Sequence, residues 1–133
     1  MTKILFVCVE NAGRSQMAEA FFRKYAPKKY QTLSAGTKPA SKINSNVNLI
    51  MKELGIDLAF QKPKTLTSEM FPDSITINMG CIDKESCPAL FADNVDDWQI
   101  PDPKGKSLEE VREIRDLIES KVKELIKHLE KNR

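Results

Sequence analysis

A cysteine at the end of a short apolar run, with an arginine and a serine six and seven residues later, constrains this chain most. Residues 4–7 are all apolar and are typical of a buried strand, which places Cys8 at the end of that strand. Apolar residues then recur at helical spacing, at Met17, Phe21 and Tyr25. Arg14 and Ser15 therefore enter the first turn of a helix, and the sequence predicts a strand, a tight loop and a helix.

The loop between these two elements is suited to hold an anion. Its five residues are Val9, Glu10, Asn11, Ala12 and Gly13. Backbone N–H groups at a helix N-terminus have no partners within the helix, and they attract negative charge. A thiol beside such groups and a guanidinium loses its proton more easily. We expect Cys8 to be a nucleophile and residues 8–14 to bind a tetrahedral oxyanion.

Each side chain of this loop also has a purely structural interpretation. Arg14 can grip two oxygens of an oxyanion, whereas a solvated arginine at a helix start would oppose the helix dipole. Ser15 can donate a hydrogen bond to the sulfur or cap the helix, and both roles are compatible. Asn11 can pin the loop or adopt a positive φ, and Gly13 can admit an anion or ease the turn. Cys8 alone could be a buried structural cysteine.

Strand-like runs and helical stripes alternate along the chain. We expect strands over residues 3–7, 30–35, 74–78 and 97–100. We expect helices over residues 14–25, 43–54, 66–70 and 108–132, with Gly55 ending the second and Ser107 capping the last. This alternation predicts a single α/β domain over residues 1–133, a four-stranded parallel sheet with helices on both faces. Ligands of such sheets bind at the carboxyl ends of strands, where Cys8 lies.

Composition and charge argue against several classes of protein. The net charge is +2, and 21 basic residues are matched by 19 acidic ones, which gives no case for nucleic acid or an anionic membrane. No apolar run approaches the roughly 20 residues of a membrane span, and we find no signal peptide. Three cysteines are an odd number, which argues against a secreted disulfide framework. We expect a cytoplasmic monomer without a metal or cofactor.

Asp102 is a candidate acid near the same edge of the sheet. It lies between Pro101 and Pro103, just after the fourth expected strand, and the two prolines stiffen its backbone. A carboxylic acid there can protonate a leaving oxygen or take a proton from an attacking water. On spacing alone, a turn aspartate before the last helix is the commoner interpretation.

Cys81 and Cys87 lie together in the long segment 79–96, which we expect to be a loop after the third strand. Three thiols could bind zinc, although the single histidine, His128, is far away on the terminal helix. The two could also be ordinary loop cysteines. The functional interpretation is a resolving pair, in which Cys81 attacks Cys8 once Cys8 carries a reducible group and Cys87 then attacks Cys81.

The chain resembles the low-molecular-weight protein tyrosine phosphatase fold nearly from end to end. The Cys8-x5-Arg14-Ser15 motif, residues 34–36 (Ser-Ala-Gly) and Asp102-Pro103 carry this resemblance. Residues 11–20 (NAGRSQMAEA), together with Cys81 and Cys87, are similar to thioredoxin-coupled arsenate reductases built on that fold. The anion loop is common to both groups, and the cysteine pair is the feature specific to the reductases.

The resemblance implies a reaction and a reductant. Cys8 attacks arsenate, Arg14 and the loop hold the oxygens, and Asp102 protonates the departing hydroxyl. Cys81 then attacks Cys8 and arsenite leaves, after which Cys87 displaces Cys8. Thioredoxin, or a similar dithiol protein, reduces the remaining Cys81–Cys87 bond. Phosphate is expected to compete with arsenate for the loop.

Two positions depart from the family pattern. Glu10 occupies a place where relatives often have glycine, so its carboxylate must point outward if an anion is to bind. Some members hold a potassium ion with residues that match Asn11, Glu19 and Ser34. The aspartate that completes their site falls at residue 64 or 65, where this chain has lysine and threonine.

Two alternative functions remain open from the sequence. The first is a low-molecular-weight phosphatase that uses Cys8, Arg14 and Asp102 on phosphotyrosine or a small phosphate ester. The second is a thiol redox or metal sensor without catalysis, which would use the three cysteines.

Overall fold

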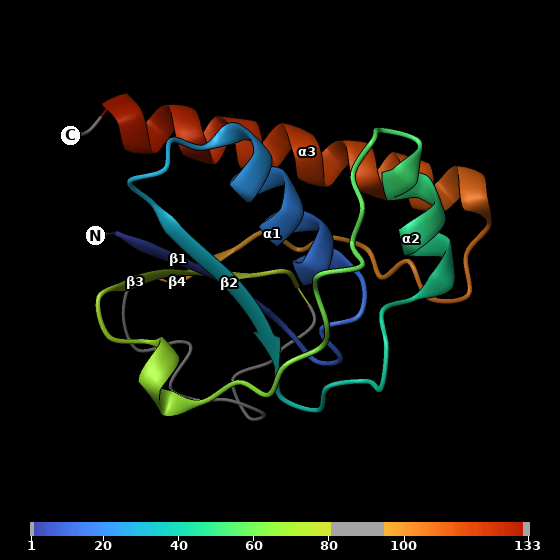
Figure 1. Cartoon of the computed structure of the whole chain (residues 1–133), viewed down its shortest axis with the longest axis horizontal. Coiled ribbons are helices and arrows are strands. Elements are labelled where there is room, and N and C mark those ends of the chain that lie inside the picture. The colour runs from blue at the N-terminus through green and yellow to red at the C-terminus, as the bar shows by residue number, and fades with distance from the viewer. Residues whose placement is uncertain (1, 81–94, 132–133) are drawn as a thin grey trace.

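The central strand of the sheet is the one that ends in Cys8. The structure, a computed structural model, describes residues 2–80 and 95–131. Strands β1 (Lys3–Cys8), β2 (Gln31–Gly36), β3 (Ser74–Asn78) and β4 (Val95–Asp97) form one parallel sheet in the order β2-β1-β3-β4. The helices are α1 (Arg14–Tyr25), α2 (Ser45–Lys52), the 3-10 helix η1 (Ser68–Met70) and α3 (Leu108–Lys131) (Figure 1).

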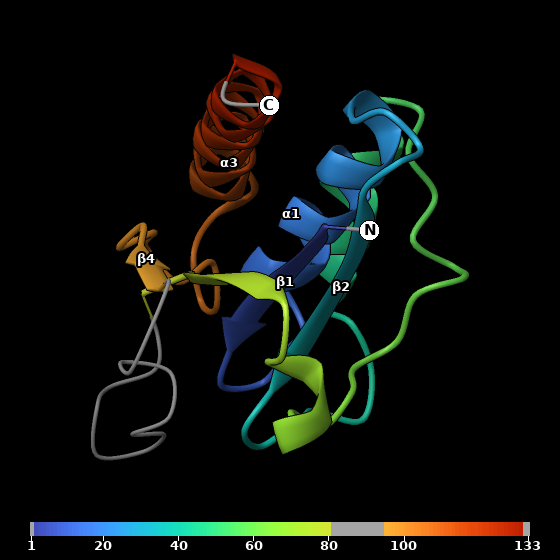
Figure 2. The same ribbon diagram turned by 90° about the vertical axis from the view of Figure 1, so that its left-hand side faces the viewer.

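Helices cover both faces of the sheet, as predicted, but unequally. The three α-helices gather on one face and η1 lies on the other (Figures 1 and 2). Along β1, Ile4 and Phe6 belong to the larger core beneath the α-helices, whereas Leu5 and Val7 belong to a smaller core that Met70 and other partly buried residues complete. Alternate strand residues point to opposite faces, so β1 is buried on both sides. This burial fixes the backbone from which Cys8 leaves the sheet.

The first three strands and the first and last helices lie where the sequence predicts them, within one residue at each end. The fourth strand does not: it was expected over residues 97–100 and is found at Val95–Asp97. Gln99 has a φ of 51°, which breaks extended backbone at the expected position. Trp98 and Ile100 are nevertheless buried, and their backbone N–H groups donate to Asn78 and Met79. Their apolar pattern therefore reflects burial without strand pairing.

The second helix is shorter than predicted at both ends. The Asn44 side chain accepts a 2.8 Å hydrogen bond from the backbone N–H of Asn46, which caps the helix and places its start at Ser45. At the other end Gly55, with a φ of 75°, ends the helix as expected. Its N–H donates to Lys52 and that of Ile56 to Met51, the paired pattern of a Schellman motif.

The helix expected over residues 66–70 is reduced to the short turn η1. The N–H of Leu66 donates to Gly36 at the end of β2, so the chain is still extended there and cannot begin a helix. Before it, Thr65 forms a parallel bridge with Gly36. The segment leading into η1 therefore lies beside the end of β2, close to the loop after Cys8.

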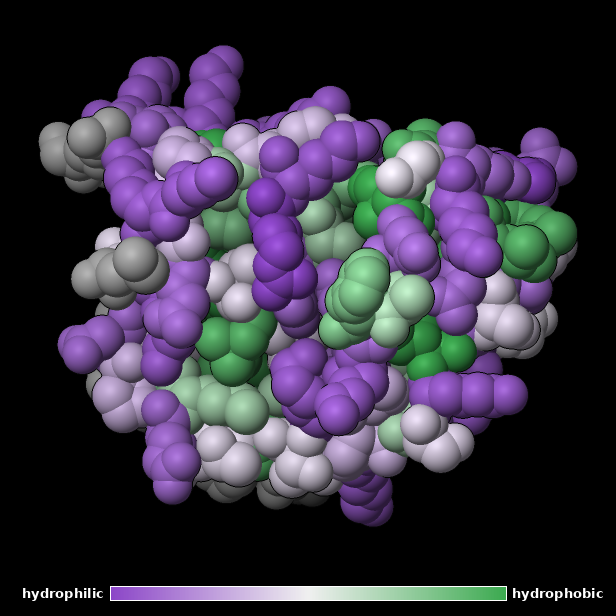
Figure 3. Space-filling view, in the orientation of Figure 1, coloured by the Kyte–Doolittle hydropathy of each residue, from purple (hydrophilic) through white to green (hydrophobic). Residues whose placement is uncertain are grey.

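Helix α3 packs against α1 and α2. Ser107 caps it as predicted, because Ser107 Oγ accepts from the N–H of Glu110 and the Glu110 carboxylate accepts from Ser107. Polar side chains cover most of the face shown in Figure 3, with apolar residues in separate small patches. Within residues 2–80 and 95–131, no helix combines the length and apolar character that a membrane crossing requires.

Candidate functional site

Cys8 lies at the carboxyl end of β1 and is 4% exposed. Gly36 is its neighbour in the sheet register. The backbone N–H of Asn11 donates to the Cys8 sulfur at 3.1 Å, and Ser15 Oγ lies 2.8 Å from the same atom. Both contacts favour the thiolate when the hydrogens point toward sulfur.

The side chain of Asn11 sets the direction of the Ser15 contact. Asn11 is fully buried with a φ of 52°, so it fills both roles that the sequence left open. Its Nδ2 donates to Ser15 Oγ at 2.7 Å, which leaves the Ser15 proton available for the Cys8 sulfur. Gln16 holds Asn11 in turn, because Gln16 Nε2 donates to Asn11 Oδ1 at 3.0 Å and to its backbone oxygen at 2.9 Å.

The loop presents backbone donors beside the sulfur. In the described part of the chain, the N–H groups of Glu10, Ala12 and Gly13 have no acceptor. Helix α1 begins directly after them at Arg14, so its first-turn N–H groups add to the positive end of the helix dipole. Such an arrangement can bind a tetrahedral oxyanion above the thiol.

Arg14 and Asp102 meet at one side of this loop. The Arg14 side chain is buried, and its Nη1 donates to the backbone oxygen of Ile100 at 2.5 Å. Its Nη2 lies 3.7 Å from Asp102 Oδ2, and the Asp102 side chain is 58% exposed. Asp102 Oδ1 accepts from the backbone N–H of Lys104, which orients the carboxyl group. The predicted acid is thus held beside the arginine, with access to solvent.

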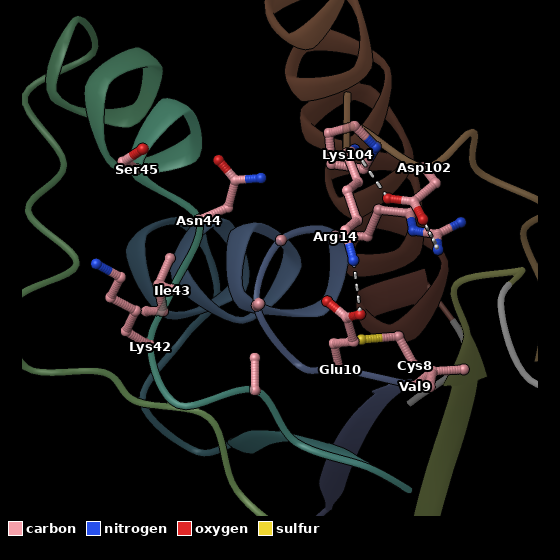
Figure 4. A pocket seen from close by; sticks show the side chains of 14 residues that line it. Cys8, Val9, Glu10, Arg14, Lys42, Ile43, Asn44, Ser45, Asp102 and Lys104 are labelled. Atoms are coloured by element: carbon pink, nitrogen blue, oxygen red, sulfur yellow. Dashed lines mark hydrogen bonds and ion pairs between the residues drawn. The ribbon is translucent and has the colours of Figure 1, made fainter. Parts of the chain in front are cut away.

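Glu10 lines the site and forms an ion pair at its edge. Its Oε1 lies 3.2 Å from Lys104 Nζ, and the two side chains are 46% and 70% exposed. The pair spans the rim between the loop after β1 and the segment that carries Asp102 (Figure 4). The Lys104 ammonium thus partly compensates the negative charge that Glu10 places near the thiol.

These residues surround a pocket of about 440 Å³. Cys8, Glu10, Arg14, Asp102 and Lys104 lie on one side of it, and residues 42–45 around the start of α2 lie opposite (Figure 4). Of the described residues that line the pocket, none is aromatic. The part of it formed by Cys8, the loop N–H groups and Arg14 suits a small anion.

The structure brings together the predicted residues 8–15 and Asp102, whereas Cys81 and Cys87 lie outside the described residues. Gly13 faces the side chain of Pro103, with a Cβ built on it 3.1 Å from Pro103 Cγ, so its small size admits the Asp102 segment. Sequence reasoning missed Asn44 and Ser45, which line the opposite wall. The cap sequence before α2 was the available signal, because a helix N-terminus is a common place for an anion.

The residues that match the family's potassium site do not fit a potassium ion here. Glu19 and Ser34 lie together, with Ser34 Oγ donating to Glu19 Oε1 at 2.5 Å. Lys64 Nζ lies 3.6 Å from the same carboxylate oxygen. The lysine therefore already places a positive charge against Glu19, where a second cation would be repelled.

Two relatives match the chain along most of its length. A protein of Halobacterium salinarum, described as a candidate arsenate reductase, is 41% identical over 132 residues, which cover 93% of this chain and 90% of the relative. The glutaredoxin arsenate reductase of Synechocystis sp. is 32% identical over 128 residues, covering 95% of this chain and 97% of its own.

Two solved structures share the fold. A thioredoxin-dependent arsenate reductase of Corynebacterium glutamicum has a TM-score of 0.84 and 34% identity; all of this chain is covered, and it spans 64% of that chain. The YwlE arginine phosphatase of Geobacillus stearothermophilus has a TM-score of 0.88 and 26% identity over 99% of this chain and 95% of its own. The family model described as low molecular weight phosphotyrosine protein phosphatase matches residues 3–133. With the cysteine, arginine and aspartate arranged as above, the chain belongs to the low molecular weight phosphotyrosine protein phosphatase family.

Proposed function

We propose that this protein reduces arsenate to arsenite, with Cys8 as the nucleophile and Cys81 and Cys87 as resolving cysteines. The observation that carries the proposal is the hydrogen-bonded Cys8 sulfur in a small pocket that Arg14 and Asp102 also line, in a chain with two further cysteines. The names of the reductase relatives support the same substrate.

In the first step the Cys8 thiolate attacks the arsenic of arsenate, and an S–As bond replaces an As–O bond. Arg14 and the N–H groups of the loop hold the remaining oxygens. Asp102 gives its proton to the departing hydroxyl, which leaves as water. Arsenic remains As(V) in this adduct, so the step is a substitution without electron transfer.

In the second step the electrons move. A Cys81 thiolate attacks the Cys8 sulfur, and the S–As bond breaks with its electron pair going to arsenic. Arsenic becomes As(III) and leaves as arsenite, while the two sulfurs form a disulfide. Cys87 then attacks Cys81, which releases the Cys8 thiolate and leaves a Cys81–Cys87 disulfide.

We propose a thioredoxin-type dithiol protein as the reductant of that disulfide. Its two thiols supply the two electrons that arsenite carries away, and they become a disulfide themselves. The thioredoxin-dependent structure supports this choice, whereas the glutaredoxin name of the Synechocystis relative supports a different dithiol protein. Supplying each reductant in turn to the same preparation distinguishes them by rate.

A phosphatase is the second candidate, since YwlE shares the fold and the first step would be the same. Water, rather than Cys81, would then attack a Cys8 phosphate adduct. None of the described residues that line the pocket is aromatic, so these residues offer a phosphotyrosine ring no stacking partner.

The test is disulfide mapping after one turnover. The reduced protein is mixed with a slight excess of arsenate, quenched in acid with an alkylating agent and digested for mass spectrometry, with phosphate as the control. We expect a Cys81–Cys87 bridge and stoichiometric arsenite with arsenate alone. Finding no bridge while the protein hydrolyses p-nitrophenyl phosphate would assign it to the phosphatases.

Single serine variants test the order of the relay. Cys8→Ser, Cys81→Ser and Cys87→Ser should each stop multiple turnover with thioredoxin. Cys87→Ser should still release one arsenite and trap a Cys8–Cys81 bond. An unchanged steady-state rate in Cys81→Ser contradicts the relay, because Cys8 would then be released without a resolving thiol.

A further inference from the structure

We propose that Lys64 is a positioning residue for Cys8, and that its ammonium, together with the Arg23 guanidinium, compensates the buried charge of Glu19. It pairs with the buried Glu19 and, through Asn11 and Ser15, holds the hydrogen bonds that keep Cys8 as a thiolate. The inference rests on the proposed role of Cys8 as nucleophile. It assigns a function to a buried acid and a lysine that the reaction itself does not use.

Glu19 is a charged residue in the interior, 3% exposed on the inner face of α1. A buried carboxylate is costly unless cations and hydrogen bonds surround it. Ser34 from β2 donates to Oε1, and Arg23, one turn along α1, donates to Oε2 at 2.6 Å. Lys64 Nζ, from the segment between α2 and η1, lies 3.6 Å from Oε1. These are the groups that face the carboxylate from each packed element.

The same lysine touches the thiol loop through its backbone. The N–H of Lys64 donates to Asn11 Oδ1 at 2.8 Å. Asn11 Nδ2 then donates to Ser15 Oγ at 2.7 Å, and that oxygen lies 2.8 Å from the Cys8 sulfur. One continuous series of contacts thus runs from the ion pair to the nucleophile. The main chain at this point is tied to the sheet as well, because the N–H of Gly36 donates to the oxygen of Lys64.

Loss of the Lys64 ammonium should favour the protonated Cys8 thiol in two ways. Without the ion pair, the backbone N–H of Lys64 holds Asn11 less firmly, and the Ser15 proton is directed less well at sulfur. The negative charge of Glu19 also becomes less compensated near the thiolate, which favours the protonated thiol. The charged groups that line the pocket itself are unchanged by the substitution: Glu10, Arg14, Lys42, Asp102 and Lys104.

The test measures the pH dependence of Cys8 alkylation by iodoacetamide. In a Cys81→Ser/Cys87→Ser background Cys8 is the one remaining thiol, since the chain has three cysteines. We expect Lys64→Gln to move the midpoint of the profile to higher pH and to slow alkylation at pH 7 by about 3- to 10-fold. Lys62→Gln, the same change at an exposed neighbour, and Lys64→Arg, which keeps the charge, should match the parent within about 2-fold.

The monovalent cation provides a second readout. Because Lys64 supplies the charge, the parent profile should be the same in potassium chloride and in choline chloride at equal ionic strength. A Lys64→Gln profile that coincides with that of Lys62→Gln overturns the proposal, and so does a parent profile that responds to potassium. Circular dichroism shows whether Lys64→Gln is folded. If it is not, the alkylation profile of Lys64→Met and the response of the parent profile to potassium test the proposal instead. No arm needs arsenate, so failure here is separable from failure of the reductase proposal.

Discussion

Ser15 Oγ lies between two partners, 2.8 Å from the Cys8 sulfur and 2.7 Å from Nδ2 of Asn11. Since an amide nitrogen can only donate, Ser15 accepts from Asn11 and donates to the sulfur. A hydrogen bond to a charged group contributes roughly 1.5–3 kcal/mol, so Ser15→Ala should slow Cys8 alkylation at pH 7 by about 10-fold or more. Ser15→Thr, which keeps the hydroxyl, should retain most of the rate. Equal profiles for Ser15→Ala and the parent would mean that the serine does not stabilise the thiolate; it does not cap α1 either, because no side chain forms a capping hydrogen bond at the start of that helix.

Asp102 offers a test of acid catalysis, because it is held beside Arg14 with its carboxyl group open to solvent. Asp102→Asn keeps the shape and removes the proton donor. We expect kcat for arsenate to fall by about 100-fold or more. Inhibition by phosphate, which reports on the anion loop alone, should change little. If phosphate inhibition weakens as much as kcat falls, Asp102 organises the pocket and does not act as the acid.

The parts of this fold that could be predicted are those whose cause is local. The strand, loop and helix around Cys8 follow from an apolar run, a short loop and a helical stripe, and Gly55 ends α2 because only glycine adopts its φ without strain. The fourth strand was misplaced because Trp98 and Ile100 have the apolar spacing of a strand. Their burial comes from packing onto the core, which a local pattern does not distinguish from sheet pairing.

The remainder of the site depends on contacts between distant parts of the sequence. Glu10 meets Lys104, and Asn11 meets the backbone of Lys64, in each case across more than 50 residues. No local spacing encodes such pairs, so the sequence left the direction of Glu10 open. The resemblance to potassium-binding relatives pointed to residue 64 or 65 without indicating that the Lys64 ammonium lies against Glu19.

Gly36 is required by close packing beneath the thiol loop. A Cβ at this position would lie 2.4 Å from the backbone oxygen of Val9 and 3.0 Å from the backbone nitrogen of Asn11. Because these are main-chain atoms, Gly36→Ala must displace the loop, at a cost of about 1–3 kcal/mol, and should sharply slow Cys8 alkylation. Gly55→Ala is the matched control: its φ of 75° costs about 1–2 kcal/mol, but no atom lies near the added methyl group. Thermal melting should show both losses, and only Gly36→Ala should change alkylation.

Glu10→Gln should strengthen anion binding with little effect on stability. The exposed Glu10–Lys104 pair contributes at most about 1 kcal/mol to folding. Removing the carboxylate takes a negative charge from the pocket lining and frees the lysine to attract the anion. We expect phosphate to bind more tightly, by calorimetry, and the gain to shrink at high salt because the charges are exposed. Glu109→Gln, an exposed change at the start of α3, is the control. Weaker binding in Glu10→Gln would show that the ion pair is needed to hold the rim closed.

Glu53 joins α2 to α3, and through α2 it supports the pocket wall at Asn44. Its carboxylate accepts from Arg112 at 2.8–3.0 Å and from Arg115 at 2.8 Å. The hydrogen bond from Arg112 is the main reason that the pKa of Glu53 lies below its ordinary value of 4.5. Because folding lowers this pKa, the ionised Glu53 carboxylate stabilises the folded protein at any pH above the ordinary pKa. This stabilisation is lost as the pH falls through the pKa that Glu53 has in the folded protein.

Glu53→Gln should therefore melt at a lower temperature than the parent at neutral pH, and the difference should shrink and then disappear as the pH falls below the ordinary value of 4.5. Glu113→Gln, the same change at an exposed position of α3, is the matched control. A gap between Glu53→Gln and the parent that persists in acid would indicate lost packing rather than lost charge. If the contacts of Glu53 with Arg112 and Arg115 also position the start of α2, Glu53→Gln should bind phosphate more weakly as well as melt at a lower temperature at neutral pH. In an Asn44→Ala background, in which α2 has already lost its cap, Glu53→Gln should cause no further loss of phosphate affinity.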